Sequence, residues 1–136
     1  MSKKANKKIE IASTLDELVN VESFLEELNT ELKFKEDVYG NVMIAVTEAV
    51  NNGIFHGNKQ NSAKRVKIAS ELLNPFLLSI TVEDEGVGFD MNKIKDPTAT
   101  ENLLNENGRG IFVIKHLTDF FEYKGRGNIL EMRFNI

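Results

Sequence analysis

The stretch EAVNNGIFHGN, residues 48–58, interrupts a pattern that otherwise predicts a regular helix. The residues before it, DVYGNVMIAVT (37–47), have the apolar spacing of an amphipathic helix. Asn51, Asn52 and Gly53 are poor helix formers, and relative to alanine the three together cost roughly 2 kcal/mol. Helix propensity therefore does not explain these three residues, which indicates that this end of the helix has a functional role.

Working outward from this stretch, the helix is expected from about residue 36 to about residue 55. His56-Gly57-Asn58 ends it, with Gly57 as a natural left-handed cap. Upstream, residues 8–12 alternate and predict a strand, after which Ser13 or Thr14 can cap a first helix. The two predicted helices carry apolar stripes at helical spacing: Leu18, Val21, Leu25, Leu28 and Leu32 in the first, and Val38, Val42, Ala45, Val46 and Ala49 in the second.

Downstream, the hydrophobic period changes from that of a helix to that of strands. Strands are expected at 65–73 and 76–83, a long loop at 91–107, a helix at 108–118 and two closing strands at 120–124 and 129–136. This order predicts an α+β domain, a two-layer α/β sandwich with helices on one face of a mixed, mostly antiparallel sheet. Residues 1–136 are expected to form a single domain.

Composition narrows the possible classes of protein. Apolar residues make up 41% and charged residues 28% of the chain, as in ordinary globular proteins. No apolar run approaches membrane-spanning length, and the N-terminus lacks the apolar segment of a signal peptide. Cysteine is absent, which excludes disulfides and fits a reducing, cytoplasmic location. The net charge of −4, without a basic patch, argues against nucleic acid as a direct partner.

Three polar clusters could carry chemistry, and the first lies on the second helix. Glu48 and Asn52 are four residues apart, so their side chains share one side of the helix beside the small Ala45 and Ala49. A carboxylate one turn from a carboxamide is a plausible pair for hydrated magnesium. The alternative is a helix edge with solvated polar groups.

The other two clusters contain glycine. Asp84-Glu85-Gly86-Val87-Gly88 ends a predicted strand, where a carboxylate could accept from an adenine amine; the alternative is a turn with an acidic start. Asn107-Gly108-Arg109-Gly110 opens a predicted helix, and free N–H groups at a helix N-terminus favour anions. The helix dipole contributes only about 0.3–1 kcal/mol, so a triphosphate would also need a metal and further donors.

Together the clusters resemble the Bergerat-type ATP-binding fold of gyrase, heat-shock 90 chaperones, histidine kinases and MutL proteins. Within that superfamily the chain resembles the bacterial anti-sigma factor serine/threonine kinases. The resemblance rests on Glu48, Asn52 and His56-Gly57 at spacings of four, on Asp84 with its glycines, and on ENGRGIFVIKHLTD (106–119). It extends from the first strand to Ile136.

The resemblance implies a role for each residue of the first two clusters. Asn52 would coordinate magnesium that bridges the phosphates of ATP, and Glu48 would be the general base toward a seryl hydroxyl. Asp84 would bind the adenine amine, while Gly86 and Gly88 would let the loop pass near the base. Phosphoryl transfer depends mainly on positioning and charge neutralisation, so such a sparse set is chemically sufficient.

The third cluster and the long loop complete the implied site. Residues 91–107 would be the ATP lid, and Gly108 to Gly110 would meet the phosphates. Arg109 could touch a phosphate or a partner, and either Thr98 or Thr100 could donate to a phosphate; these alternatives stay open. Where many superfamily members have Gly-Thr, this chain has Gly127-Asn128, so the contact near Asp84 is lost or made by Asn128 or a water.

The implied function is an ATP- and Mg²⁺-dependent protein serine/threonine kinase that sequesters a sigma factor and phosphorylates an anti-anti-sigma (STAS-type) protein. A homodimer is expected from the family. Two alternatives are a nucleotide-gated binding module that transfers nothing and a detached histidine-kinase catalytic domain. His56 is expected to be structural rather than catalytic, and His116 to be at the surface or half-buried.

Overall fold

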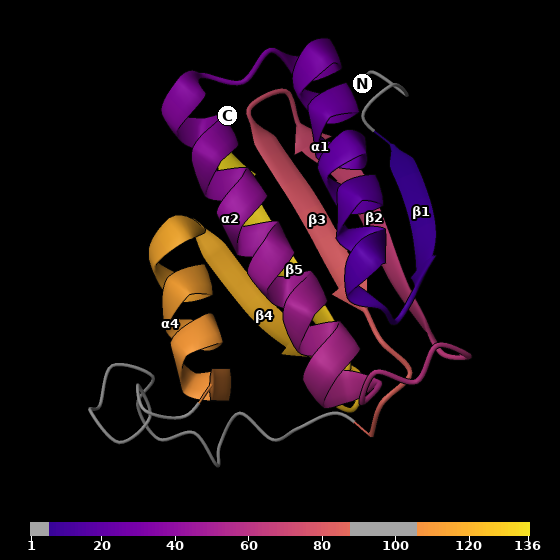
Figure 1. Ribbon diagram of the computed structural model, residues 1–136. Coiled ribbons are helices and arrows are strands. Elements are labelled where there is room, and N and C mark those ends of the chain that lie inside the picture. Colours follow the sequence, from indigo (N-terminus) through magenta and orange to yellow (C-terminus); the bar gives the residue numbers. More distant parts are fainter. Residues whose placement is uncertain (1–5, 88–105) are drawn as a thin grey trace.

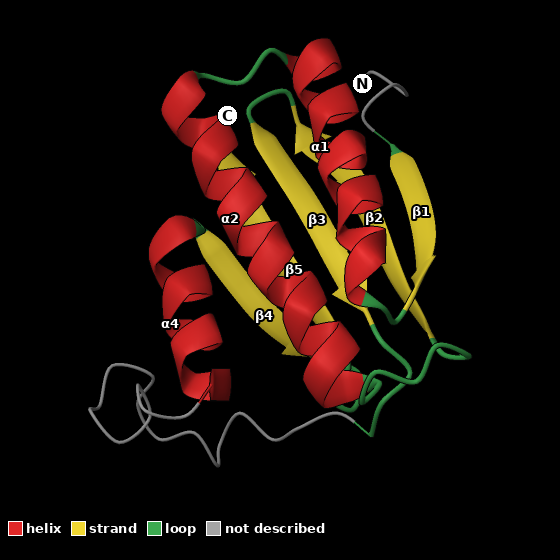
Figure 2. Cartoon of the chain, viewed as in Figure 1, coloured by secondary structure: helices red, strands yellow, loops and turns green. Residues whose placement is uncertain are grey.

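The computed structural model describes residues 6–87 and 106–136, which form a five-stranded sheet and three α-helices (Figures 1 and 2). Their order agrees with the predicted alternation of strands and helices. In chain order the elements are β1 (Lys7–Ala12), α1 (Leu18–Leu32), α2 (Glu36–Asn52), β2 (Arg65–Asn74), β3 (Leu77–Glu83), α4 (Glu106–Leu117), β4 (Phe120–Lys124) and β5 (Ile129–Asn135).

The strand order in the sheet is β1-β2-β3-β5-β4. The four pairings described are all antiparallel, so the predicted parallel component of a mixed sheet is not present in them. β2 and β3 form a direct hairpin through Asn74-Pro75, as predicted, and β4 and β5 form another. Because α4 delivers β4 to the outer edge, β5 returns to the interior and pairs with β3 at the centre of the sheet.

All three α-helices cover the same face of this sheet, with α2 over its middle and α4 beside β4 (Figure 1). The core lies between the two layers, and the alternating strands supply its floor, for example Ile68, Ile80 and Met132. The predicted stripes are buried where they face the sheet, and α1 adds Phe24. The two-layer α+β architecture is therefore confirmed. Among the described residues, no helix combines the length and apolar character needed to cross a membrane.

The entry to α1 differs from the predicted cap. Neither Ser13 nor Thr14 caps the helix, because a 3-10 turn, Leu15–Glu17, comes first and Thr14 makes no side-chain cap bond. Ser13 is fully buried and its hydroxyl donates to the Lys64 carbonyl at 2.8 Å. Glu17 accepts from the Ala12 N–H at 2.8 Å. Ser13 thus ties the first loop to the segment before β2, a contact that local sequence does not reveal.

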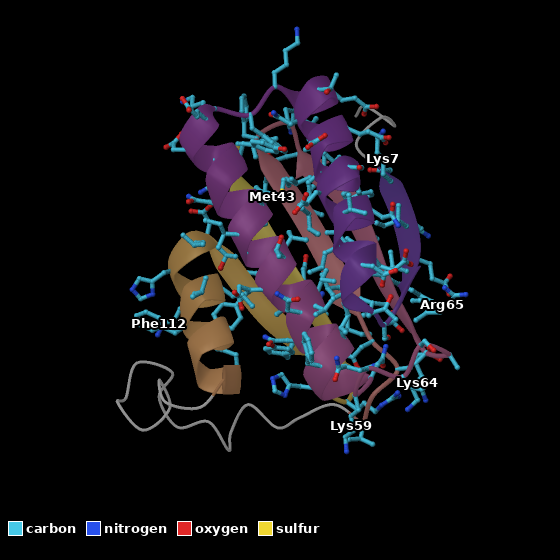
Figure 3. The ribbon with its side chains drawn as sticks, in the orientation of Figure 1. Lys7, Met43, Lys59, Lys64, Arg65 and Phe112 are labelled. Carbon is cyan, nitrogen blue, oxygen red and sulfur yellow. The ribbon has the colours of Figure 1, made fainter. Side chains whose placement is uncertain are left out.

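The end of α2 also differs from the prediction, and this end carries the quoted stretch. The helix passes at Gly53 into a π-helical turn, Gly53–Gly57, and Asn58 follows it. Gly57 is not left-handed, so the predicted cap was wrong; Lys59 and Gln60 take the left-handed conformation instead, with φ of 52° and 58°. Figure 3 labels Lys59 at this end of the molecule. Inserted π turns are common at functional sites, which fits the poor helix formers found here.

The third helix begins at Glu106 rather than at Gly108, and its outer side is solvent-facing. His116 is exposed, as expected, and its ring lies 4.2 Å from that of Phe112. Figure 3 shows Phe112 on the side of α4 away from α2. The predicted lid, 91–107, falls almost wholly outside the described residues, as do Thr98, Thr100 and Gly88.

Candidate functional site

The first two clusters meet at a cavity of about 220 Å³ between the end of α2 and the sheet. Its wall combines small and apolar residues with a few polar groups, as nucleotide and drug-sized ligand sites do. The lining residues are Ala49, Asn52, Gly53, His56, Gly57, Val82, Asp84, Ile111, Tyr123, Gly127, Asn128 and Leu130. Asn52 and Asp84, 32 positions apart in the printed sequence, therefore border one cavity.

Asp84 is half-buried at the end of β3 and accepts a hydrogen bond from the Gly86 N–H at 2.8 Å. Burial raises the pKa of this carboxyl above its usual value, although the Gly86 bond and the charge of Arg126 act in the opposite direction. Burial and the nearby Asp84 charge likewise raise the pKa of Tyr123, so its phenol stays protonated. A partly desolvated carboxylate beside a cavity is suited to a ligand that donates hydrogen bonds, such as an exocyclic amine.

Two glycines allow the Asp84 turn to approach the end of α2. A Cβ on Gly57 would collide with the Asp84 carboxylate, and a Cβ on Gly86 would collide with the Gly57 carbonyl. The close approach that Gly86 permits is therefore to the backbone of its own chain. Gly53 differs, because an added Cβ there would make ordinary contacts at 3.6 Å with Asp84 and Val66. Alanine would therefore fit at position 53.

Asn128, the residue before β5, stabilises the Asp84 turn by hydrogen bonds to the main chain of Asp84. The Asn128 amide donates to the Asp84 carbonyl at 2.9 Å, and the Asp84 N–H donates to the Asn128 carbonyl at 3.0 Å. Asn128 thus makes a contact at the position of the family's Gly-Thr, although to the backbone of Asp84. Arg126 adds a bond from its Nε to the Gly86 carbonyl at 2.7 Å.

Asn58 is a central residue of the site that sequence reasoning missed. It is 1% exposed, and its amide donates to the Ser13 hydroxyl at 2.8 Å and to the Arg65 carbonyl at 2.9 Å. Its side-chain oxygen accepts from the Glu85 N–H at 2.8 Å. One buried carboxamide therefore joins the turn after β3 to two other segments. Its place in the HGN run was the one available signal.

The third cluster reaches the first through Gly110 of α4. An added Cβ on Gly110 would lie 2.9 Å from the Asn52 amide nitrogen and 3.2 Å from its oxygen, so a larger residue there would displace the Asn52 side chain. The backbone of Gly108 and Arg109 belongs to the first turn of α4. The phosphate contacts of Gly108, Arg109 and Gly110 stay a prediction.

A second hollow, of about 500 Å³, lies on the other side of Asn52, and we call it the Glu48 groove. Its lining includes both Asn52 and His56, which also border the first cavity. The full set is Leu15, Leu18, Glu48, Asn51, Asn52, Phe55, His56, Gly110 and Val113. Glu48 is half-buried there. The predicted base and the predicted adenine ligand thus face two adjoining hollows with Asn52 between them.

The described residues contain no cluster of three His, Asp or Glu side chains able to hold a metal alone. This fits a magnesium ion that arrives with phosphates, because Mg²⁺ keeps several waters and takes few protein ligands. The Asn52 oxygen at the junction of the two hollows suits such an ion.

Comparison with known proteins assigns the class. The family described as "Histidine kinase-like ATPase domain" matches residues 11–134. This range includes the three α-helices, both hollows and the described sheet, apart from the first four residues of β1 and the last residue of β5. The chain therefore belongs to the histidine kinase-like ATPase domain family, and the domain is an ATP-binding one. A histidine kinase domain of the blue-light activated histidine kinase from Erythrobacter litoralis shares the fold. Its TM-score is 0.53 and its identity 19%, covering 99% of this chain and 65% of that one.

Curated relatives narrow the family further. An anti-sigma F factor of Clostridium perfringens (strain SM101 / Type A) is 30% identical over 124 residues, 86% of this chain and 85% of that protein. One of Priestia megaterium is 30% identical over 83% of this chain and 74% of that protein. One of Heyndrickxia coagulans is 28% identical, with 85% and 79% covered. Within the ATPase family, the chain is thus a member of the anti-sigma F factor family.

Proposed function

We propose that this protein is an anti-sigma regulator that binds a sigma factor and transfers the γ-phosphoryl group of ATP to a serine of an anti-anti-sigma (STAS-type) protein. The observation that carries the proposal is the pair of adjoining hollows with Asn52 and His56 in both walls. In the first hollow, the Asp84 carboxylate can accept a hydrogen bond from the adenine base. In the Glu48 groove, the Glu48 carboxylate can take the proton of the attacking serine. Membership in the anti-sigma F factor family supports the choice of partners.

In the first hollow, Asp84 would accept from the adenine amine, and the apolar Val82, Ile111 and Leu130 would pack against the ring. The turn that carries Asp84 is held by Asn58 and Asn128, so little ordering remains to be done when ATP binds. Gly88 and Gly108 to Gly110 would leave room along the nucleotide, while Gly86 lets the Asp84 turn approach the backbone of Gly57. The site would hold ATP with its phosphates directed toward Asn52.

In the Glu48 groove, the acceptor seryl oxygen would attack the γ-phosphorus. The bond from that phosphorus to the β–γ bridging oxygen would break, ADP would leave with that oxygen, and the seryl proton would pass to the Glu48 carboxylate. Asn52 would hold Mg²⁺, which when bound supplies charge neutralisation on the phosphates. The roles of Arg109, Thr98, Thr100 and the lid at 91–107 stay predictions, as do the homodimer, the cytoplasmic location and a single domain over residues 1–136.

Transfer of label from radiolabelled ATP tests the proposal. The wild type, mixed with purified anti-anti-sigma proteins of the source organism, should label a seryl residue. Glu48→Ala should abolish labelling while ATP with magnesium still raises the melting temperature. Glu36→Ala, at the exposed start of the same helix, is the matched control and should transfer normally. Binding of ATP without transfer by the wild type would instead favour a nucleotide-gated binding module, and labelling of a histidine would favour a histidine-kinase catalytic domain.

A further inference from the structure

The Glu48 groove contains a polar atom that the proposed chemistry does not use. The side-chain oxygen of Asn51 is buried and has no hydrogen-bond partner within the described parts of the chain. Asn51 lies three residues after Glu48 on α2, so the two side chains share one side of the helix and line the same groove. Asn51 is also one of the poor helix formers that set the quoted stretch apart.

A buried carbonyl oxygen without a donor lowers stability, by about 1–3 kcal/mol in typical proteins. Such groups are rare in native structures, and one beside a candidate site indicates a donor that arrives with a ligand. ATP is a poor source of this donor, because its phosphates are acceptors and its amine would lie at Asp84 in the other hollow. A protein segment is a better source, since every residue except proline carries a main-chain N–H.

The remaining walls of the groove also suit a protein segment. Leu15, Leu18, Phe55 and Val113 are apolar and line the groove together with the polar Glu48 and Asn51. Leu15 is 50% exposed, so apolar surface reaches the rim of the groove. A hydrated ion alone would gain nothing from these walls, whereas apolar side chains next to a serine would be desolvated on them.

We propose that Asn51 positions the phospho-acceptor: its side-chain oxygen accepts a hydrogen bond from a main-chain N–H of the segment that brings the serine to Glu48. The segment taken by this groove carries apolar residues beside its serine. This inference rests on the proposed kinase function and adds a determinant of acceptor specificity. It also explains why a costly residue occupies position 51, since no described part of the free chain donates to its oxygen.

The test compares Asn51→Ala and Asn51→Leu, which keeps the number and branching of the side-chain heavy atoms, with Asn41→Ala, a control on the same helix more than two turns away. The probe is the anti-anti-sigma protein that the wild type labels, assayed with magnesium and ATP. We expect the KM for this protein to rise about tenfold in both Asn51 variants, with kcat and the ATP-induced rise in melting temperature unchanged. The nucleotide-free melting temperature should stay level or increase, because an unpaired buried oxygen is gone.

Each other outcome overturns the inference in a recognisable way. An unchanged KM means that the acceptor does not use Asn51. A lower melting temperature in both variants means that Asn51 is bonded in the free protein and is structural. Loss of the ATP-induced stabilisation means that the oxygen serves the metal-bound waters. If the wild type labels no acceptor at all, the kinase proposal itself fails and takes this inference with it, whereas the first three outcomes leave the kinase proposal standing.

Discussion

Two carboxylates at the centre of this sheet have opposite surroundings. Asp84 directly follows β3 and borders the cavity at the end of α2, which is the proposed ATP site. Glu131 lies in β5 next to β3, between the core residues Leu130 and Met132. Because side chains alternate along a strand, that of Glu131 points to the other face of the sheet from these two. Glu131 is nevertheless only 4% exposed. Both acids are thus withdrawn from water, and the difference lies in the donors that each receives.

Glu131 is surrounded by donors from its own chain. It accepts from the Ser79 hydroxyl at 2.7 Å, from Lys124 at 2.7 Å and from the Arg133 Nε at 3.0 Å. Burial by itself would raise the pKa of this carboxyl, but the hydrogen bonds from Arg133, Lys124 and Ser79 outweigh it and lower the pKa to about 2. Arg133 is in turn held over the Phe120 ring at 4.5 Å. Glu131 is fully engaged and has a structural role.

Asp84 shows the opposite balance. Gly86 supplies its hydrogen bond, while Arg126 uses its Nε for the Gly86 carbonyl and helps Asp84 only through its charge. Burial therefore dominates, and the pKa of Asp84 is raised where that of Glu131 is lowered. The comparison indicates that a carboxylate removed from water with few hydrogen-bond donors marks a ligand site. A carboxylate that is hydrogen-bonded to several cationic side chains stabilises the fold instead.

The largest expected effect comes from Asp84→Asn. The affinity for ATP should fall about a hundredfold, or about 3 kcal/mol, because a charge-assisted bond is lost and the remaining oxygen stays on Gly86. Titration calorimetry with magnesium and ATP measures this. The melting temperature without nucleotide should not fall, since removing the charge removes its burial penalty. An unchanged ATP affinity would contradict the assignment of Asp84 to the base.

Glu131→Gln should have the opposite effect, lowering stability while leaving the ATP affinity unchanged. Breaking a buried ion pair costs about 3–5 kcal/mol, but Lys124 and Arg133 are 44% and 34% exposed, so we expect about 2 kcal/mol and a melting point lower by roughly 6–8 °C. ATP affinity should be unaffected, since Glu131 lies on the other face. Thermal unfolding with and without ATP measures both quantities, and a weakened ATP affinity would break the contrast between the two acids.

The pH dependence sharpens the same contrast. The folded pKa of Glu131, about 2, lies below its ordinary value of 4.5. Its contribution to stability is therefore complete above pH 4.5 and is lost as the pH falls toward 2. The difference in unfolding free energy between wild type and Glu131→Gln should shrink across that window. Urea denaturation as a function of pH measures it, and a constant difference would show that charge is not the cause.

Gly57→Ala probes the close approach behind Asp84. The new Cβ would displace the Asp84 carboxylate, so we expect an ATP affinity about tenfold lower and a stability loss of about 1–2 kcal/mol. Gly53→Ala is the matched control, because its Cβ would make only ordinary contacts at 3.6 Å. Equal behaviour of the two variants in calorimetry would mean that the Asp84 turn moves freely.

The smallest effect is a gain. Gly40 lies inside α2, and an added Cβ there would meet no atom within 4 Å. Gly40→Ala should therefore stabilise the protein by about 0.5–1 kcal/mol through helix propensity and the unfolded state. Denaturant unfolding measures the gain, and ATP affinity should be unchanged. A loss of stability would indicate that Gly40 is needed for contacts outside the described residues.

Much of the fold could be predicted because its signals are local. Alternation and the Asn74-Pro75 turn gave the β2–β3 hairpin, and spacings of three and four gave the buried sides of α1 and α2. Predictions failed where a distant segment replaced a local partner. Ser13 looks like a cap but bonds to Lys64, and Gly57 looks like a left-handed cap but instead makes room for Asp84.

The candidate site divides in the same manner. Glu48, Asn52 and Asp84 could be selected in advance, because carboxylates, carboxamides and glycines at these spacings form a motif shared with a family. Asn58, Tyr123 and Arg126 could not be selected from the sequence, because their roles depend on contacts with segments that are distant in the chain. Asn58, for example, bonds to Ser13 and Glu85, which are 45 and 27 positions away.

By itself, the sequence determined the helical and extended segments and membership in the anti-sigma F factor family, and it predicted the residues of an ATP site. These depend on neighbours within a turn or on residue identity alone. Tertiary structure decided which carboxylate faces a ligand and which is bonded by its own chain, because burial and donor supply come from segments far apart in sequence. Asp84 directly follows β3 and Glu131 lies in the adjacent β5, and only the packing of α2, β4 and β5 around them separates their roles.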